Sequence, residues 1–283
     1  MVATNLAAPT DRPAHARQDS QVVRPKVWAD VAAAVLALFL GLPLVGLLSR
    51  GLTSGDLLAA LTRPIAYEAL RLSLTTTAVV LVLSLTLGSA LAFMLARRRF
   101  LGVSLLDTLV DLPMVLPPAV AGLALLMTFG RRGVFGAPLG ALGLELPFTT
   151  AAVVLAATFV SAPFFVRAAR AGFQAVPREV EEAGRVDGCS DWQVFRFITA
   201  PVAAPALFGG AILCGARALG EFGATIMFAG SFQGRTQTMP LAIYSALESD
   251  LDAAISLSLV LLLVSFVLLL AFRRWLGGQA DTG

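Results

Sequence analysis

The chain has 283 residues, of which 57% are hydrophobic and 14% charged, and its mean hydropathy is +0.82. This composition is typical of proteins that lie largely within a lipid bilayer rather than of soluble domains. The formal net charge is +3, without a basic stripe interleaved with aromatic residues, so nucleic-acid binding is not expected. A single histidine and two cysteines leave almost no ligands for a structural metal site.

Residues 1–26 lack the short apolar core of a secretory signal and predict a disordered tail. Six apolar runs follow, each long enough to cross a hydrocarbon core about 30 Å thick. The runs are Val31–Leu48, Leu70–Ala96, Leu105–Gly130, Pro147–Val166, Ala206–Gly230 and Ala253–Phe272. They predict an all-α polytopic membrane protein with six transmembrane helices. We expect a first helix and outer loop over residues 27–67, a five-helix core over 68–272 and a C-terminal tail over 273–283.

The basic residues predict the orientation of these helices, because cytoplasmic loops carry an excess of lysine and arginine. With the N-terminus in the cytoplasm, fourteen of the 21 basic residues lie inside, six outside and one, Arg217, within a span. Both termini are therefore expected in the cytoplasm, as is the long connection 167–205. The sequence predicts a multi-pass protein of the cytoplasmic membrane, surrounded by lipid.

The third apolar run contains two adjacent prolines, Pro117 and Pro118. A proline inside a helix removes a hydrogen-bond donor and clashes with the preceding turn. Irregular backbone at membrane depth is tolerated only where protein or a water-filled path satisfies its polar groups. Two structures remain open, a kinked helix packed by its neighbours and a broken helix beside a pathway.

The fifth apolar run contains two charged residues, Arg217 and Glu221, which are spaced i, i+4 and can pair on one face of a helix. Charges within a span usually face the interior of a bundle or an aqueous path. The pair could therefore lock helix packing or act directly in a gate. In either case, removing one partner is expected to cost more than removing both.

The connection between the fourth and fifth runs is unusually polar and has the pattern of two short helices. Val176, Val180 and Ala183 are spaced as one face of a helix, and Gly188 is expected to end it. Ser190 and Gln193 have the spacing of a capping box that begins a second helix.

The second helix of this connection would carry Trp192, Phe195 and Ile198 on an apolar side, and Pro201 would end it. An amphipathic helix in the lipid interface is one explanation of the aromatic residues. The acidic residues favour a protein partner, because the inner leaflet is itself anionic.

The sequence of this connection resembles a known motif. Glu182-Ala183-Gly184, Gly188 and Ile198-Thr-Ala-Pro201 are similar to the EAA motif, E-A-A-x3-G-x9-I-x-L-P, of ABC importer permeases. Gly184 replaces the second alanine and Ala200 replaces the leucine, while the spacing is intact. The resemblance implies a type I ABC importer permease fold with a cytoplasmic coupling helix. The residues implied to couple to the ATPase are Glu182, Ala183, Gly184, Gly188, Trp192, Ile198 and Pro201.

The chain itself contains no G-x4-G-K-[ST] sequence, and its single lysine is Lys26, so a P-loop for ATP is absent. The resemblance therefore implies that ATP and Mg²⁺ bind a separate ATPase subunit, in two copies, and that this chain is not an enzyme and binds no cofactor. It also implies a homodimer of this chain in a bacterial or archaeal membrane.

A second resemblance covers residues 216–225, Ala-Arg-Ala-Leu-Gly-Glu-Phe-Gly-Ala-Thr, and the stretch Gly-Arg-Thr-Gln-Thr from Gly234 to Thr238. Both are similar to molybdate ABC permeases and, more loosely, to sulfate/thiosulfate permeases. This implies import of molybdate, and of the nearly isosteric tungstate, delivered by an extracytoplasmic oxyanion-binding protein. Candidate pore or gate residues are Arg217, Glu221, Thr225, Arg235, Pro117 and Pro118.

Two alternatives remain beside the molybdate importer. One is a sulfate/thiosulfate ABC permease. The other is an ion-coupled secondary transporter with Arg217 and Glu221 as its coupling site, which would need no ATPase partner.

Overall fold

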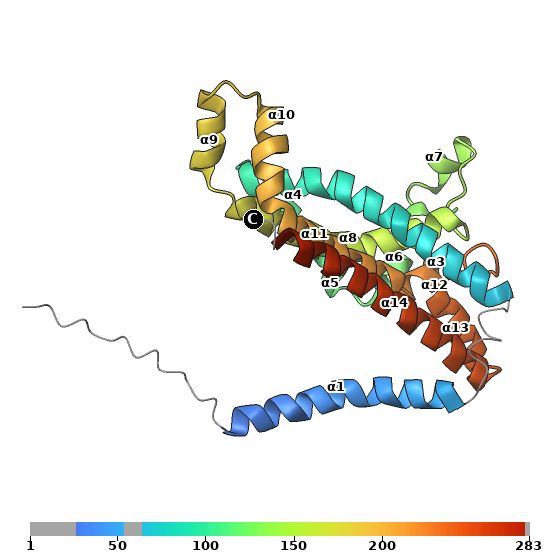
Figure 1. Cartoon of the computed structure of the whole chain (residues 1–283). Coiled ribbons are helices and arrows are strands. Elements are labelled where there is room, and N and C mark those ends of the chain that lie inside the picture. The colour runs from blue at the N-terminus through green and yellow to red at the C-terminus, as the bar shows by residue number, and fades with distance from the viewer. Residues whose placement is uncertain (1–26, 54–63, 281–283) are drawn as a thin grey trace, which may run out of the picture. The chain divides into compact units, whose positions relative to one another are not determined.

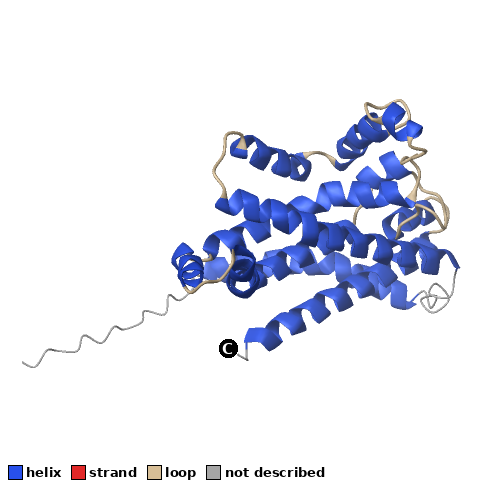
Figure 2. Ribbon diagram, turned by 90° about the horizontal axis from the view of Figure 1, so that it is seen from above, coloured by secondary structure: helices blue, strands red, loops and turns tan. Residues whose placement is uncertain are grey.

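The computed structural model describes residues 27–53 and 64–280, so the predicted tail over residues 1–26 and part of the first outer loop lie outside the described residues. Every regular element in this described part is helical (Figure 2). The chain divides into two units, residues 1–46 and 47–283. Helix α1 (Val27–Thr53) corresponds to the first apolar run.

Within the described ranges, five helices are long and apolar enough to cross a membrane, and the bent pair α5–α6 would make a sixth. This agrees with the six predicted spans. The elements after α1 are α3 (Pro64–Leu83), η1 (Ser84–Gly88), α4 (Ser89–Arg97), α5 (Val103–Val115), α6 (Pro118–Phe129), α7 (Gly136–Ala141), α8 (Thr150–Ala175), α9 (Arg178–Val186), α10 (Asp191–Val194), η2 (Phe195–Thr199), α11 (Ala200–Leu219), α12 (Gly223–Ala229), α13 (Met239–Leu247) and α14 (Leu251–Ala280).

The third apolar run is a broken helix rather than a kinked one. Helices α5 and α6 meet at an angle of 120°. Leu116 and Pro117 between them are extended, with ψ angles of 134°, as expected for residues that precede a proline. Pro118 then begins α6, where its missing N–H leaves no hydrogen bond unmade.

The fourth span is longer than the sequence predicts, because α8 continues to Ala175 instead of giving way to a loop at Arg167. The two arginines in its last turns pair with acids of α5. Arg167 bonds to Asp111 and lies 3.2 Å from Asp107, and Arg170 also bonds to Asp107. Their charges are therefore partnered within the bundle, which lets the helix extend.

The prediction of one unbroken fifth span over Ala206–Gly230 is wrong. Helix α11 ends at Leu219 and a new helix, α12, begins at Gly223. At the C-terminal end of the chain, α14 continues past Phe272, the predicted end of the last span, as far as Ala280.

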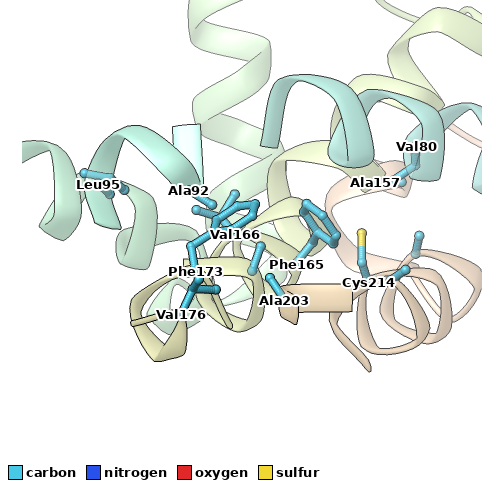
Figure 3. Close-up of a cluster of buried hydrophobic side chains, with 13 residues drawn as sticks. Val80, Ala92, Leu95, Ala157, Phe165, Val166, Phe173, Val176, Ala203 and Cys214 are labelled. Atoms are coloured by element: carbon cyan, nitrogen blue, oxygen red, sulfur yellow. The ribbon is translucent and has the colours of Figure 1, made fainter. Parts of the chain in front are cut away.

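The largest buried cluster lies where α8 packs against α3, α4 and α11 (Figure 3). Phe165, Phe173 and Cys214 are fully buried in it. Small residues bring the helices close, since a Cβ added to Gly172 of α8 would lie 2.5 Å from the Cβ of Ala206 in α11. Such contacts between small residues allow helix backbones to approach in a membrane. Cys214 and the exposed Cys189 are both free cysteines.

The connection between α8 and α11 lies at one end of the helices of the second unit. Figure 1 shows α9 and α10 side by side at this end, with α7 and α13 at the opposite end. The last turns of α14 lie at the same end as α9 and α10. We call α9, the turn at Gly188 and α10 the hairpin.

Candidate functional site

The hairpin has the local structure that its sequence predicts. Gly188 has a φ of +90° and ends the turn after α9, a conformation that favours glycine. The predicted capping box is present: Ser190 N–H donates to Gln193 Oε1 at 2.8 Å, and Gln193 N–H donates to Ser190 Oγ at 3.4 Å. The two helices are therefore joined in a fixed geometry by short-range signals alone.

The buried side of α9 is not the one that the sequence predicts. Val176 lies before the helix, because Pro177 favours an extended conformation at the residue that precedes it. Val180 and Ala183 are exposed. The side chains that α9 buries are Glu181 and Gly184, so the predicted apolar face was wrong.

The prediction that Pro201 ends the second helix is also wrong. Residues 191–219 form one continuous helical stretch, with a π-helical turn, η2, just before α11. Pro201 lies in the first turn of α11. In a π-turn the hydrogen bonds run to the fifth residue instead of the fourth, and this change of register relieves the conflict that proline makes in a regular helix.

The exposed surface of the hairpin is both acidic and aromatic. Glu182 and Ala183 point to solvent on α9, and Trp192 on α10 is 65% exposed. Trp192 stacks on Phe195, with ring centroids 5.8 Å apart. We call Glu182, Ala183 and Trp192 the docking surface, because tryptophan is enriched where another protein covers a surface.

Gly184 and Ile198 set the distance between α9 and η2, the π-turn that follows α10. A Cβ added to Gly184 would lie 2.6 Å from Ile198 Cδ1, so Ile198 packs directly over the glycine. Of the residues implied to couple to an ATPase, three therefore form the surface, and Gly184, Gly188 and Ile198 shape the hairpin. Pro201 lies outside it, in α11.

A buried ionic network attaches the hairpin to the spans. Arg97, at the end of α4, donates to Glu181 Oε1 at 2.8 Å and to the carbonyl oxygen of Val176 at 3.1 Å. Thr199 Oγ1 donates to the same Glu181 oxygen at 2.6 Å. Glu181 is only 5% exposed. The sequence did not predict this network: Arg97 entered only the count of basic residues, and Glu181 was assigned no role.

A cavity of about 880 Å³ lies between α4 and the hairpin. Its apolar wall includes Leu85 and Phe93, and its charged wall includes Arg98 and Arg178 beside the Arg97–Glu181 pair. Across its mouth, Arg185 donates to Asp191 at 2.9 Å, and this hydrogen bond raises the pKa of the Arg185 guanidinium. The pair links α9 to α10 at the surface of the hairpin.

Arg217 and Glu221 form an ion pair, as predicted, but not within one helix. Arg217 Nη1 lies 2.7 Å from Glu221 Oε2. Glu221 Oε1 accepts a hydrogen bond from the backbone N–H of Ala224 at 2.8 Å. The carboxylate therefore satisfies a free N–H at the beginning of α12, which accounts for the break after Leu219.

The break brings four of the six pore candidates into one region. A Cβ added to Gly223 would lie 2.6 Å from Pro118 Cβ, so the α5–α6 break and the α11–α12 break are in direct contact. Thr225, in α12, is 1% exposed and its hydroxyl has no hydrogen-bond partner in the described part of the chain. Glu221 and Thr225 lie two residues before and after Gly223, Arg217 pairs with Glu221 and Pro117 precedes Pro118, so these candidates lie near the contact between the two breaks.

Arg235 is not part of this region. It lies in the exposed connection between α12 and α13, where its carbonyl oxygen accepts a hydrogen bond from Thr150 Oγ1 at 2.9 Å. Its side chain is free to face solvent at the end of the molecule away from the hairpin.

Comparison with known proteins agrees with this arrangement. Residues 84–277 match the family described as "Binding-protein-dependent transport system inner membrane component". The chain is similar to the molybdenum transport system permease protein ModB of Mycobacterium bovis, with 41% identity over 243 residues, which is 86% of this chain and 92% of that protein.

Two solved structures have a similar fold. A bacterial ABC transporter involved in the import of alginate has a TM-score of 0.71 at 16% identity and covers 88% of this chain and 93% of that one. The alginate transporter in complex with an alginate pentasaccharide-bound periplasmic protein has a TM-score of 0.69 at 17% identity, covering 87% and 93%. The fold is therefore that of ABC importer permeases. This multi-pass chain belongs to the family of inner membrane components of binding-protein-dependent transport systems.

Proposed function

We propose that this chain is the membrane-spanning subunit of an ATP-driven importer of molybdate, and of tungstate as its near isostere. It would work as a homodimer with two ATPase subunits and an extracytoplasmic oxyanion-binding protein. The observation that supports the substrate best is the 41% identity to a molybdenum transport permease over 86% of the chain. Two stretches resemble molybdate permeases. Residues 216–225 contain the α11–α12 break, and residues 234–238 lie in the loop between α12 and α13.

The docking surface supports a separate ATPase partner. Glu182, Ala183 and Trp192 are exposed at one end of the spans, where an aromatic anchor beside a charge fits a cleft of another protein. Closure of two ATPase subunits around ATP would draw the two hairpins of the dimer together. The chain lacks a P-loop sequence, so in this proposal ATP and Mg²⁺ bind the partner, and this chain has no enzymatic activity and no cofactor.

The orientation follows from the positions of the hairpin and the basic residues. The hairpin and the last turns of α14 lie at the same end of the second unit, and Arg97 to Arg99 mark this end. An excess of basic residues is typical of the cytoplasmic side. We therefore place the hairpin and both termini in the cytoplasm of a bacterial or archaeal cell, with Arg235 at the outer mouth.

The contact between the two helix breaks is the proposed gate. Glu221 holds α12 in place through Ala224 and Arg217, and Gly223 packs on Pro118. Broken helices at membrane depth are found where they line a pathway. The unpartnered hydroxyl of Thr225 could donate to a passing oxyanion, whose binding must stay weak enough for release.

The uptake of labelled molybdate, into cells with and without this chain, tests the proposed substrate. We expect uptake to be lost on deletion, to be blocked by unlabelled tungstate and to be little affected by sulfate. Strong competition by sulfate would favour a sulfate/thiosulfate permease. Uptake that collapses with an uncoupler but needs no ATPase partner would favour the secondary transporter. Unchanged molybdate uptake on deletion would contradict the molybdate assignment.

The substitution Glu182→Lys tests the docking surface. It reverses the charge at an exposed position, so the chain should fold normally while its ATPase subunits are lost during purification. Glu248→Lys, a charge reversal on an exposed residue at the end of α13, is the matched control and should retain them. Normal co-purification and normal uptake with Glu182→Lys would refute the assignment of this surface.

A further inference from the structure

Glu181 joins parts of the chain that are far apart in sequence. Its carboxylate is held by Arg97 at the end of α4 and by Thr199 at the beginning of the α11 span. We infer that Glu181 is a positioning residue, which transmits movement of the hairpin to α4 and α11. The inference rests on the proposed function, because it needs an ATPase that moves the hairpin.

The contacts of α9 make Glu181 its firmest attachment to the spans. In the described chain, α9 buries only Glu181 and Gly184. Gly184 meets Ile198 through apolar contact, which has no preferred direction and allows sliding. Glu181 accepts two hydrogen bonds, at 2.6 and 2.8 Å. Hydrogen bonds to a charged group are short and directional, so they fix the position of α9 relative to α4 and η2.

The Arg97 guanidinium extends this attachment to the fourth span. Besides Glu181, it donates to the carbonyl oxygen of Val176 at 3.1 Å. Val176 is the residue that connects α8 to α9, and it is buried in the main cluster. Arg97 therefore holds both Val176, just before α9, and Glu181, within α9. Movement of α9 cannot leave α4 in place without breaking these bonds.

Thr199 connects the network to the π-turn η2, directly before α11. It is the last residue of the π-turn η2 and is 1% exposed. Single π-turns inside α-helices frequently occur at functional sites, because the helix changes its hydrogen-bond register there. Movement of Glu181 would act on the turn at which the span begins.

The surface pair Arg185–Asp191 differs from the Arg97–Glu181 pair in its exposure and in what it joins. Its side chains are 46% and 88% exposed, and it joins α9 only to α10, within the hairpin. Exposed pairs contribute little because water and salt screen them. The side chains of Arg97 and Glu181 are 13% and 6% exposed, so that their interaction is shielded from this screening.

The test uses the complete transporter in proteoliposomes and measures uptake per ATP hydrolysed. Glu181→Gln retains the shape of the side chain but removes its charge. We expect uptake per ATP to fall about tenfold, within the range of about 5- to 150-fold that is typical of coupling between sites. The unfolding temperature should fall, because Arg97 loses its anionic partner, so uptake per ATP is measured well below the unfolding transition, where the amount of bound ATPase should change little. Glu179→Gln, on the exposed side of the same helix, is the control and should behave as the unmodified chain.

Two variants at Thr199 separate a loss of coupling from a loss of folding. Thr199→Val removes the hydroxyl but keeps the volume, and uptake per ATP should fall, by less than in Glu181→Gln. Thr199→Ser keeps the hydroxyl and should restore it. A purely structural role predicts instead that uptake and ATP hydrolysis fall together with the amount of assembled complex.

Two results would overturn the inference: uptake per ATP that is unchanged in both Glu181→Gln and Thr199→Val, or equal losses in Thr199→Val and Thr199→Ser. Failure of the proposed function is a different result, since ATPase subunits would then not co-purify with the unmodified chain.

Discussion

Among the described residues, two buried glutamates are paired with arginine, Glu181 and Glu221, and they differ in what they join. Glu221 is bound by Arg217, four residues earlier, and by the N–H of Ala224, three residues later. Glu181 is bound by Arg97, 84 residues earlier, and by Thr199, 18 residues later. The first shapes a local break between two helices, and the second connects separate elements of the bundle.

The difference shows how burial and sequence distance set the role of an ion pair. Arg217 is 30% exposed at its side chain, so water can enter the place it occupies and solvate Glu221 if Arg217 is removed. Arg97 and Glu181 are both nearly buried, so each depends on the other. A buried pair is not a large net source of stability, but the loss of one partner leaves an uncompensated charge. We therefore expect substitutions at the two pairs to have effects of different size.

The largest effect on stability is expected for Arg97→Ala. It leaves the Glu181 carboxylate buried with the Thr199 hydroxyl as its remaining donor among the described residues. The free energy of unfolding should fall by about 3–5 kcal/mol, measured by thermal unfolding of the purified chain. Arg98→Ala, at the next and exposed position, should change it by less than about 0.5 kcal/mol. Equal unfolding temperatures for the two variants would mean that the Arg97–Glu181 pair is solvated in the protein.

A smaller effect is expected at the second pair. Arg217→Ala leaves Glu221 with the Ala224 N–H and should lower the free energy of unfolding by about 2 kcal/mol, less than for a fully buried pair. Adding Glu221→Gln removes the stranded charge while its amide oxygen can still accept from Ala224. The double variant should therefore be more stable than Arg217→Ala in the same thermal measurement. A double variant less stable than the single one would contradict this account of the break.

The smallest effect on stability is expected for Thr225→Val. The hydroxyl has no partner in the described chain and is buried, so its removal should change the free energy of unfolding by less than about 1 kcal/mol, or raise it. If Thr225 donates to the oxyanion, molybdate uptake should nevertheless fall. Thr158→Val, at another buried hydroxyl without a partner, is the matched control and should leave uptake unchanged. Equal uptake by the two variants would limit Thr225 to packing.

Features that depend on a few neighbouring residues were predicted correctly. The turn at Gly188 and the capping box of Ser190 and Gln193 need only the residues that form them. The Arg217–Glu221 pair is present because its partners are close in sequence. Six apolar segments and a helical membrane fold follow from hydropathy, since an apolar helix of this length crosses the lipid with its backbone hydrogen bonds made within the helix.

Features that depend on distant partners were missed or predicted wrongly. The i, i+4, i+7 pattern of Val176, Val180 and Ala183 indicated an apolar buried face, but the structure buries Glu181 because Arg97 and Thr199 surround it. The arginines of α8 indicated a loop, but Asp107 of α5 lets the helix continue.

The sequence by itself determined that this is a helical membrane protein, where its apolar segments lie, and the fold of the hairpin. These follow from hydropathy and from hydrogen bonds between near neighbours. Only the tertiary structure decided which charges are buried, that Pro201 lies inside a continuous helix and that two helix breaks meet at Gly223 and Pro118. The physical reason is that the free energy of a buried charge or a close contact is set by what surrounds it, and those groups come from elsewhere in the chain.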